Sequence, residues 1–218
     1  RDQGTIRIVK NTVNANGTFN FTSASSVGNF SLSTVGNTAT TSTVNVDTGS
    51  INLAETVPAG WTLSAISCTG GSADRQGDGV QVEIVKGANV VCTFTNTRNQ
   101  GSLRIVKNTL GGNGTFNFTS ASTIGNFSLS TVGNTATTST VVVDSGSYTV
   151  AETAQPGWTL TSLVCNNNNY TVNNNSVTVA VATGENVVCT YTNTRDTGKL
   201  QIKKNTVKSD GDTQFSWN

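Results

Sequence analysis

The chain has 218 residues, of which only 11% are charged, and its formal net charge is +1. A balance this close to neutral offers no basic field for nucleic acid or for an anionic membrane surface. Apolar runs are only a handful of residues long, so the sequence shows neither a transmembrane helix nor a secretory signal. A composition rich in Thr, Ser, Asn and Gly is typical of secreted β-rich chains, and we expect an extracellular or cell-surface location.

The chain is built from a repeat. Residues 4–12, GTIRIVKNT, return as GSLRIVKNT at 101–109 and as GKLQIKKNT at 198–206, a spacing of 97 residues both times. Each full repeat has the length of one Ig-like β-sandwich domain. We therefore predict an all-β chain with one sandwich at 1–97, a second at 98–194, and the first hairpin of a truncated third repeat at 195–218.

The two ends match internal parts of the repeat. Residues 1–4 match the linkers at 98–101 and 195–198. We expect the chain to be part of a longer array, in which linkers of about four residues limit bending.

In chain order, the first predicted strand covers residues 5–11, and its alternation turns Ile6, Ile8 and Lys10 to one face. Alternating aromatic residues follow at 19–21 and 30–32, and one further strand is predicted over 38–46. After a turn, Glu55 shares the face of the apolar residues at 51 and 53. A lysine and a carboxylate are thus both aimed at the core, where an unpaired charge is costly.

The second half of the repeat adds an amide to that face. Trp61 begins a strand that ends at Cys68, and residues 68–79 are predicted as a hydrophilic loop, replaced in the other repeat by an Asn-rich segment at 166–169. Residues 80–84 form the penultimate strand. In the last strand, Cys92 and Asn96 share the inward face.

These polar residues recur in both repeats as Lys10, Glu55, Asn96 and as Lys107, Glu152, Asn193. Three motifs surround them: G-x-[IL]-x-I-x-K at the start, G-x-[IY]-x-[LV]-x-E-T in the middle, and [FY]-x-N-T at the end. With these motifs each repeat resembles the collagen-adhesin B-type, or prealbumin-like, domains of bacterial pilins and surface proteins. The resemblance implies a prealbumin-like sandwich and a spontaneous isopeptide bond between lysine and asparagine, promoted by glutamate.

The residues support that chemistry independently. Apolar burial lowers the pKa of a lysine, which attacks an amide only as the neutral amine. The same burial raises the pKa of Glu55, and a protonated carboxyl is expected to polarise the Asn96 carbonyl and to pass its proton to departing ammonia. The alternative is a Lys10 ammonium that reaches water, an ordinary ion pair with Glu55, and an Asn96 that caps its strand.

The four cysteines, Cys68, Cys92, Cys165 and Cys189, form one pair per repeat, each 24 residues apart. Even numbers at a repeated spacing favour disulfides, which would stabilise each domain by about 3 kcal/mol. Typical domains of the similar family lack this pair, so a disulfide in place of the isopeptide bond is an open alternative. Free buried thiols are another, whereas zinc binding is disfavoured because the chain has no His.

Other sites are weaker candidates. Asn-x-Ser/Thr triplets, which are candidate glycan acceptors, occur at Asn16, Asn20, Asn29, Asn113, Asn117, Asn126, Asn169 and Asn174. Asp74 and Asp78 suggest calcium only weakly, because the second repeat has no acid there. A glycosidase pair of Asp47 and Glu55 is disfavoured, since a turn explains the first and Lys10 the second. We expect no cofactor, no metal site and no enzymatic turnover.

The sequence therefore predicts a structural subunit of an extracellular stalk, pilus or filament. Such a chain would self-associate, and the segment 198–218 would complete a neighbouring sandwich by strand addition. The alternative is an adhesin whose variable loops, 69–79 and 166–170, bind a glycan or a host protein, with the repeats acting as a spacer.

Overall fold

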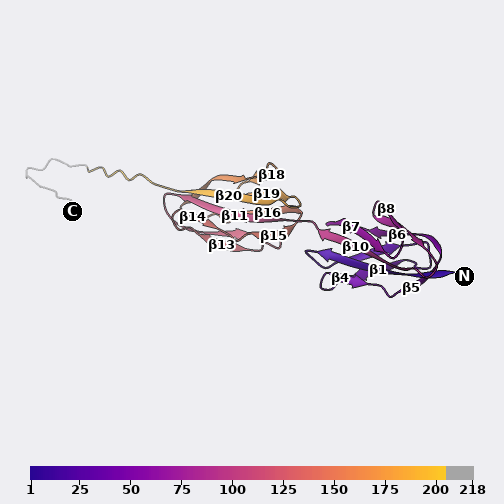
Figure 1. Ribbon diagram of the computed structural model, residues 1–218. Helices are drawn as coiled ribbons and strands as arrows, with labels where there is room; N and C mark the ends of the chain where they lie inside the picture. The colour runs from indigo at the N-terminus through magenta and orange to yellow at the C-terminus, as the bar shows by residue number, and fades with distance from the viewer. Residues whose placement is uncertain (205–218) are drawn as a thin grey trace, which may run out of the picture.

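The computed structural model describes residues 1–204, which form two β-sandwiches placed end to end (Figure 1). These residues contain strands and turns but no helix, and hence no helix suited to crossing a membrane. The predicted all-β fold with tandem sandwiches is confirmed.

Each sandwich packs two five-stranded sheets face to face. In the first sandwich one sheet consists of β1 (Gln3–Val13), β4 (Thr38–Thr40), β5 (Val44–Asp47), β7 (Trp61–Thr69) and β10 (Asn89–Arg98). The other consists of β2 (Thr18–Thr22), β3 (Phe30–Ser33), β6 (Gly49–Thr56), β8 (Ala73–Gln76) and β9 (Gly79–Ile84). Their strand orders are β4-β1-β10-β7, with β5 also paired to β1, and β3-β2-β6-β9-β8.

The second sandwich repeats this topology strand for strand. One sheet consists of β11 (Gln100–Leu110), β14 (Thr135–Thr137), β15 (Val141–Asp144), β17 (Trp158–Cys165) and β20 (Asn186–Arg195). The other consists of β12 (Thr115–Thr119), β13 (Phe127–Ser130), β16 (Gly146–Glu152), β18 (Tyr170–Asn173) and β19 (Ser176–Val181).

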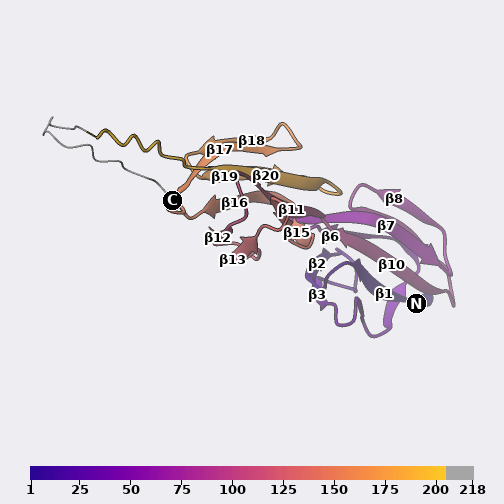
Figure 2. The ribbon, with the colours of Figure 1, turned by 90° about the vertical axis from the view of Figure 1, so that its left-hand side faces the viewer.

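The first and last strands of each sandwich are parallel neighbours. In the first, β1 pairs with β10 from Thr5 opposite Asn89 to Val13 opposite Thr97, and Figure 2 shows these strands side by side with β7. Because both run in the same direction, the chain enters the sandwich at one end and leaves at the other. Lys10 and Asn96 come close together near the exit end, since Thr12 lies opposite Asn96.

The core follows the alternation of the strands. Inward residues of β1, β2 and β10 are fully or almost fully buried, among them Ile8, Phe19, Phe21 and Phe94. Phe21 lies edge-on to Phe94 with ring centroids 5.2 Å apart. Burial of each such side chain stabilises the fold by about 1.5–3 kcal/mol. The aromatic residues of β2 and β10 therefore provide much of the free energy that holds the two sheets together.

A β-bulge explains why the inward residues of β7 change parity. Trp61 and Leu63 are buried, but the next inward-facing positions are Ile66 and Cys68, three residues after Leu63. The register with β10 shifts at Thr95/Asn96, which gives β7 one extra residue at this point. The bulge lets both the tryptophan and the cysteine face inward, a feature that simple alternation does not predict.

Two predicted segments are wrong in detail. The single strand over 38–46 is two strands, β4 and β5, both on the edge of β1, with residues 41–43 between them held by hydrogen bonds of Thr41 to Ile8. The predicted loop 68–79 contains β8, which pairs with β9. All four residues of β8 are exposed, so no apolar alternation marks this strand.

The connection between the sandwiches is shorter than the predicted four residues. β10 ends at Arg98 and β11 begins at Gln100, so a single residue lies between them. Residues 196–204 contain no strand, and the rest of the hairpin predicted for 195–218 lies outside the described residues.

The opening glycine of the repeat is required by close packing. A Cβ at Gly101 would lie 2.5 Å from Val181 Cγ1 and 2.6 Å from the carbonyl oxygen of Ala182. We expect Gly101→Ala to lower the stability of the second sandwich by about 1–3 kcal/mol, because backbone would have to move. Gly146→Ala is the matched control, since a Cβ there meets nothing within 4 Å. Calorimetry of the full chain would test this, and equal melting temperatures for the two variants would contradict it.

Candidate functional site

Lys10 lies inside the first sandwich with a side chain that is 0% exposed. Its Nζ donates to the carbonyl oxygens of Asn11 at 3.2 Å and Phe94 at 3.1 Å, and to Asn96 Oδ1 at 2.6 Å. The alternative in which the ammonium reaches water is therefore wrong. Lys10 continues the inward face of β1, and its amino group lies beside the last strand.

Asn96 lies between the lysine and the glutamate. Its Oδ1 accepts from Lys10, and its Nδ2 donates to Glu55 Oε1 at 2.5 Å. The residue is fully buried, so its amide is fixed by these two partners rather than by water.

Glu55 reaches the site from β6 in the opposite sheet. Its Oε2 is 3.5 Å from Lys10 Nζ and has no hydrogen-bond partner among the described residues. We predicted a hydrogen bond from the carboxyl to the carbonyl oxygen of Asn96, and the structure differs. Lys10 donates to that oxygen instead, and the carboxyl accepts from the amide nitrogen of Asn96, which is the group that would depart as ammonia.

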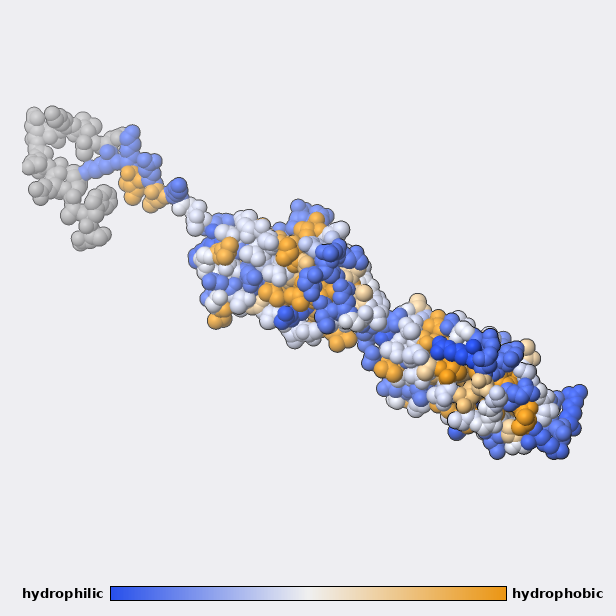
Figure 3. Space-filling view, turned by 45° about the horizontal axis from the view of Figure 1, so that its top comes forward, coloured by the Kyte–Doolittle hydropathy of each residue, from blue (hydrophilic) through white to orange (hydrophobic). Residues whose placement is uncertain are grey.

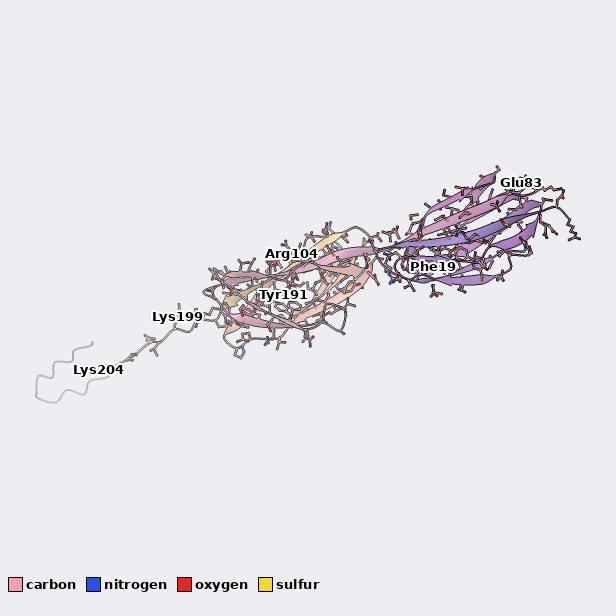
Figure 4. All side chains as sticks on the ribbon, turned by 60° about the horizontal axis from the view of Figure 1, so that its bottom comes forward. Phe19, Glu83, Arg104, Tyr191, Lys199 and Lys204 are labelled. Atoms are coloured by element: carbon pink, nitrogen blue, oxygen red, sulfur yellow. A yellow bond between two sulfur atoms is a disulfide. The ribbon has the colours of Figure 1, made fainter. Side chains whose placement is uncertain are left out.

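Aromatic rings make the site apolar. Lys10 Nζ is 4.3 Å from the ring centroid of Phe19, whose position is labelled in Figure 4. Burial lowers the pKa of Lys10 to about 8, although the charge of Glu55 opposes this shift. Burial also raises the pKa of Glu55, against the opposing effects of Lys10 and the Asn96 hydrogen bond. Both shifts favour the uncharged forms, an amine and a carboxylic acid.

The second sandwich repeats the site. Lys107 Nζ is 2.6 Å from Asn193 Oδ1, Asn193 Nδ2 is 2.5 Å from Glu152 Oε1, and Glu152 Oε2 is 3.4 Å from Lys107 Nζ. Burial lowers the pKa of Lys107 as it does that of Lys10. Tyr191 replaces Phe94, and its hydroxyl donates to the Val150 carbonyl oxygen at 2.7 Å. The same geometry therefore survives a change in its aromatic surroundings.

The cysteines form the predicted disulfides. Cys68 is bonded to Cys92 with an S–S distance of 2.02 Å, and Cys165 to Cys189 at 1.93 Å. Each bond joins directly opposed residues of neighbouring strands, β7 to β10 and β17 to β20. The free-thiol interpretation is wrong. Because β10 also carries Asn96, the last strand is tied to β7 on one side and faces the lysine of β1 on the other.

The weaker candidates lie apart from this site. Asp47 is exposed and accepts from Arg1 and Gln3, whereas Glu55 is buried beside Lys10. Asn20 Oδ1 accepts from the Ser31 hydroxyl at 2.6 Å on an exposed strand face. Within residues 1–204 no group of three or more His, Cys, Asp or Glu side chains is placed to hold a metal ion, and this includes Asp74 and Asp78.

Sequence reasoning missed the ring beside the amino group. Phe19 and Phe116 each lie 4.3 Å from a lysine Nζ, and both come from the motif N-G-T-F-N-F. The pattern identified these residues as core, and nothing in it distinguished the ring that faces the lysine from its neighbour two residues later.

The family and structure comparisons agree with this architecture. A family model described as a prealbumin-like fold domain, SpaA_4, matches residues 6–98 and again 103–195. No curated protein sequence matches the chain.

Several solved structures are similar in fold at low identity. The major pilin from Streptococcus pyogenes is 12% identical with a TM-score of 0.51, over 89% of this chain and 98% of the pilin. A C-terminal fragment of the pilus adhesin SpaC from Lactobacillus rhamnosus GG is 13% identical with a TM-score of 0.45, over 93% of this chain and 100% of the fragment. At such identity the pilin match supports a shared fold only.

Proposed function

Because the chain belongs to the family of prealbumin-like fold domains, we propose that it is a structural subunit of an extracellular stalk, pilus or filament. In this proposal the sandwiches bear load, and self-association or a longer array extends them. A streptococcal major pilin shares this fold, and the proposal extends the structural role of that pilin to this chain. Glycans on exposed Asn or Ser/Thr side chains remain part of the prediction, as does strand addition by 198–218, most of which lies outside the described residues.

The observation that carries the proposal is the buried contact between lysine and asparagine. It joins the first strand of each sandwich to the last, in both sandwiches, at 2.6 Å. A glutamate from the facing sheet contacts the amide nitrogen in both. We propose that this geometry produces an isopeptide bond between Lys10 and Asn96 and another between Lys107 and Asn193.

The bond would form as follows. Lys10 passes a proton to Glu55 Oε2, and its neutral Nζ attacks the Asn96 side-chain carbon. The C–N bond to Nδ2 breaks as Glu55 protonates the departing nitrogen, and the resulting carboxylate takes the remaining extra proton from the new amide nitrogen, so one ammonia leaves for each new amide bond. The folded strands supply the proximity. The step happens once per site, and we propose that the chain modifies itself and has no turnover activity.

Such a bond would change how the sandwich carries force. The chain enters along β1 and leaves along β10, which are parallel, so tension shears these two strands against each other. A covalent link between Lys10 and Asn96 would pass the tension directly from the first strand to the last. The strands between them would then carry no load.

A binding role is the second candidate. The variable loops 69–79 and 166–170 differ in sequence between the repeats, and the strand β8 within the first is exposed throughout. Variation on an exposed edge suits an adhesin in which these segments contact a glycan or a host protein. Exchange of the two segments would change ligand binding in that case and would leave it unchanged for a purely structural subunit.

The first prediction concerns mass. We expect the reduced, unglycosylated full chain to weigh about 34 Da less than its sequence predicts, since each bond expels ammonia of about 17 Da. Glu55→Gln removes the acid at similar volume and is expected to restore about 17 Da in the first sandwich alone. Glu83→Gln is the control, because Glu83 is an exposed glutamate on β9. If the full chain shows no mass deficit, the lysine and the glutamate form only a noncovalent ion pair and the proposed bonds do not exist.

The second prediction concerns pH. The reactive pair holds one proton, with Lys10 neutral and Glu55 protonated. At low pH Lys10 stays protonated as well as Glu55, so the amine cannot attack. Above about pH 8, the lowered pKa of Lys10, the pair loses its last titrating proton and Glu55 can no longer act as the acid. Ammonia release after refolding of unreacted chain should therefore follow a bell-shaped profile with its basic limb near pH 8. A rate that keeps rising to pH 10 would show that no acid is needed.

The third prediction concerns extension under force. A bonded first sandwich should not lengthen. In Glu55→Gln, unfolding should release at least the 86 residues between Lys10 and Asn96 less the 24 that the disulfide encloses, which is 62 residues, or about 210 Å of contour. Reduction should raise this step to about 300 Å. Single-molecule pulling would measure both, and a 210 Å step in the unaltered first sandwich would contradict the proposed bond.

A further inference from the structure

One residue, Asn99, connects the two sandwiches and is hydrogen-bonded to both. Its N–H donates to the Gly60 carbonyl oxygen of the first sandwich at 2.9 Å, and its own carbonyl oxygen accepts from the Ser145 N–H of the second at 2.9 Å. Its side-chain oxygen also accepts from the Thr62 hydroxyl at 2.8 Å. The connection is therefore fixed on both sides by backbone bonds. In Figure 3 the two bodies meet at a narrow waist.

Arg98 crosses this waist. Its guanidinium lies over Trp61, with Cζ 5.4 Å from the ring centroid, and it contacts the Asp144 carboxylate through both Nε, at 3.0 Å, and Nη2. Gln100 donates to the same carboxylate at 3.3 Å. This is the bidentate and stacked arrangement for which arginine is suited and lysine is not.

The second sandwich carries the same end face without a described sandwich against it, which gives an internal comparison. Gly60 has Arg98 Nη1 2.9 Å from the place where a Cβ would be, whereas nothing lies within 4 Å of that place at Gly157. Trp61 is 9% exposed, while Trp158 is only half-buried. Arg195, which matches Arg98, is exposed. The arginine is thus stacked on the tryptophan at the end face that contacts a following sandwich, and it is exposed at the end face that does not.

The edge that carries Asp144 in the second sandwich has a counterpart at Asp47 in the first. At the start of the first sandwich, Arg1 donates to Asp47 at 2.9 Å and Gln3 donates to it at 3.1 Å. The Thr48 N–H donates to the Asp2 carbonyl oxygen at 3.1 Å, as the Ser145 N–H does to Asn99. Asp47 and Asp144 therefore each receive the arginine that precedes the first strand of their own sandwich.

We propose that the end face formed by Gly60, Trp61 and Arg98 is a docking site for the aspartate-bearing edge of the sandwich that follows it in the chain. In this arrangement the docking contact, and not the covalent connection alone, fixes the orientation of consecutive sandwiches. The partner is defined by its chemistry: a sandwich of the same kind with an aspartate at the position of Asp144. This inference does not depend on whether the isopeptide bonds form.

We expect the contact between Arg98 and Asp144 to contribute little free energy but to fix the orientation of the two sandwiches. The Arg98 and Asp144 side chains are 25% and 45% exposed, and isolated ion pairs at such exposure contribute little to stability. Here, however, the connection already holds the two faces together, so a small free energy suffices to select one orientation.

The test is ¹⁵N relaxation of the full chain, which reports whether the sandwiches tumble as one body. The unaltered chain should give correlation times for both sandwiches that fit a single elongated body. Asp144→Asn removes the charge at constant shape and should shorten the correlation times of both. Asp47→Asn is the matched control, because it makes the same change at the same position of the other sandwich and leaves the junction intact. Amide spectra would verify that each variant folds.

A second measurement needs no variant. About 1 M salt shortens the screening length to about 3 Å and should shorten the correlation times of the unaltered chain in the same way as Asp144→Asn. Three outcomes would overturn the proposal: independent tumbling in the unaltered chain, unchanged tumbling in Asp144→Asn, or an equal effect of Asp47→Asn. Each would mean that the orientation is free or is set by Asn99 alone.

Discussion

The structure depends on the burial of a lysine amino group in an aromatic core. Lys10 has no contact with water, and its neighbours are Phe19, two backbone carbonyl oxygens, an amide and a carboxyl. An ammonium is costly in such a place unless it is paired, and a carboxylate is equally costly. The pair therefore shifts toward an amine and an acid. The proposed attack on the amide needs these uncharged forms. Burial therefore both disfavours the charged pair and favours the forms that would react.

The parallel pairing of β1 and β10 would give the proposed bond a mechanical role. A bond between antiparallel neighbours joined by a hairpin would close a short loop, whereas Lys10 and Asn96 are 86 residues apart and lie on the strands by which the chain enters and leaves. The disulfide acts on the other side of β10 and encloses only 24 residues. In the proposed function the two links have different roles, since only the lysine contact joins the strands by which the chain enters and leaves.

Much of the fold could be predicted from the sequence because both sheets have one buried face. Alternation in the first strand predicted that Lys10 points inward with Ile6 and Ile8, and all three are buried. Where a strand is exposed on both faces, as β8 is, alternation disappears and the segment was predicted as a loop. The split of β4 from β5 and the bulge in β7 were also missed, because both arise from pairing with distant strands.

The sequence by itself therefore determined the repeat, and it predicted the sandwich class, the inward positions of lysine, glutamate and asparagine, and one pair of cysteines in each repeat. Local pattern and spacing are sufficient for these features. Only the tertiary structure decided that the glutamate contacts the amide nitrogen, that Phe19 covers the amino group, and that Arg98 reaches Asp144 in the next sandwich. The glutamate and arginine contacts join strands far apart in the chain, and Phe19, although close to Lys10 in sequence, lies in the facing sheet. The distances between these side chains are set by how sheets and domains pack, which no local pattern records.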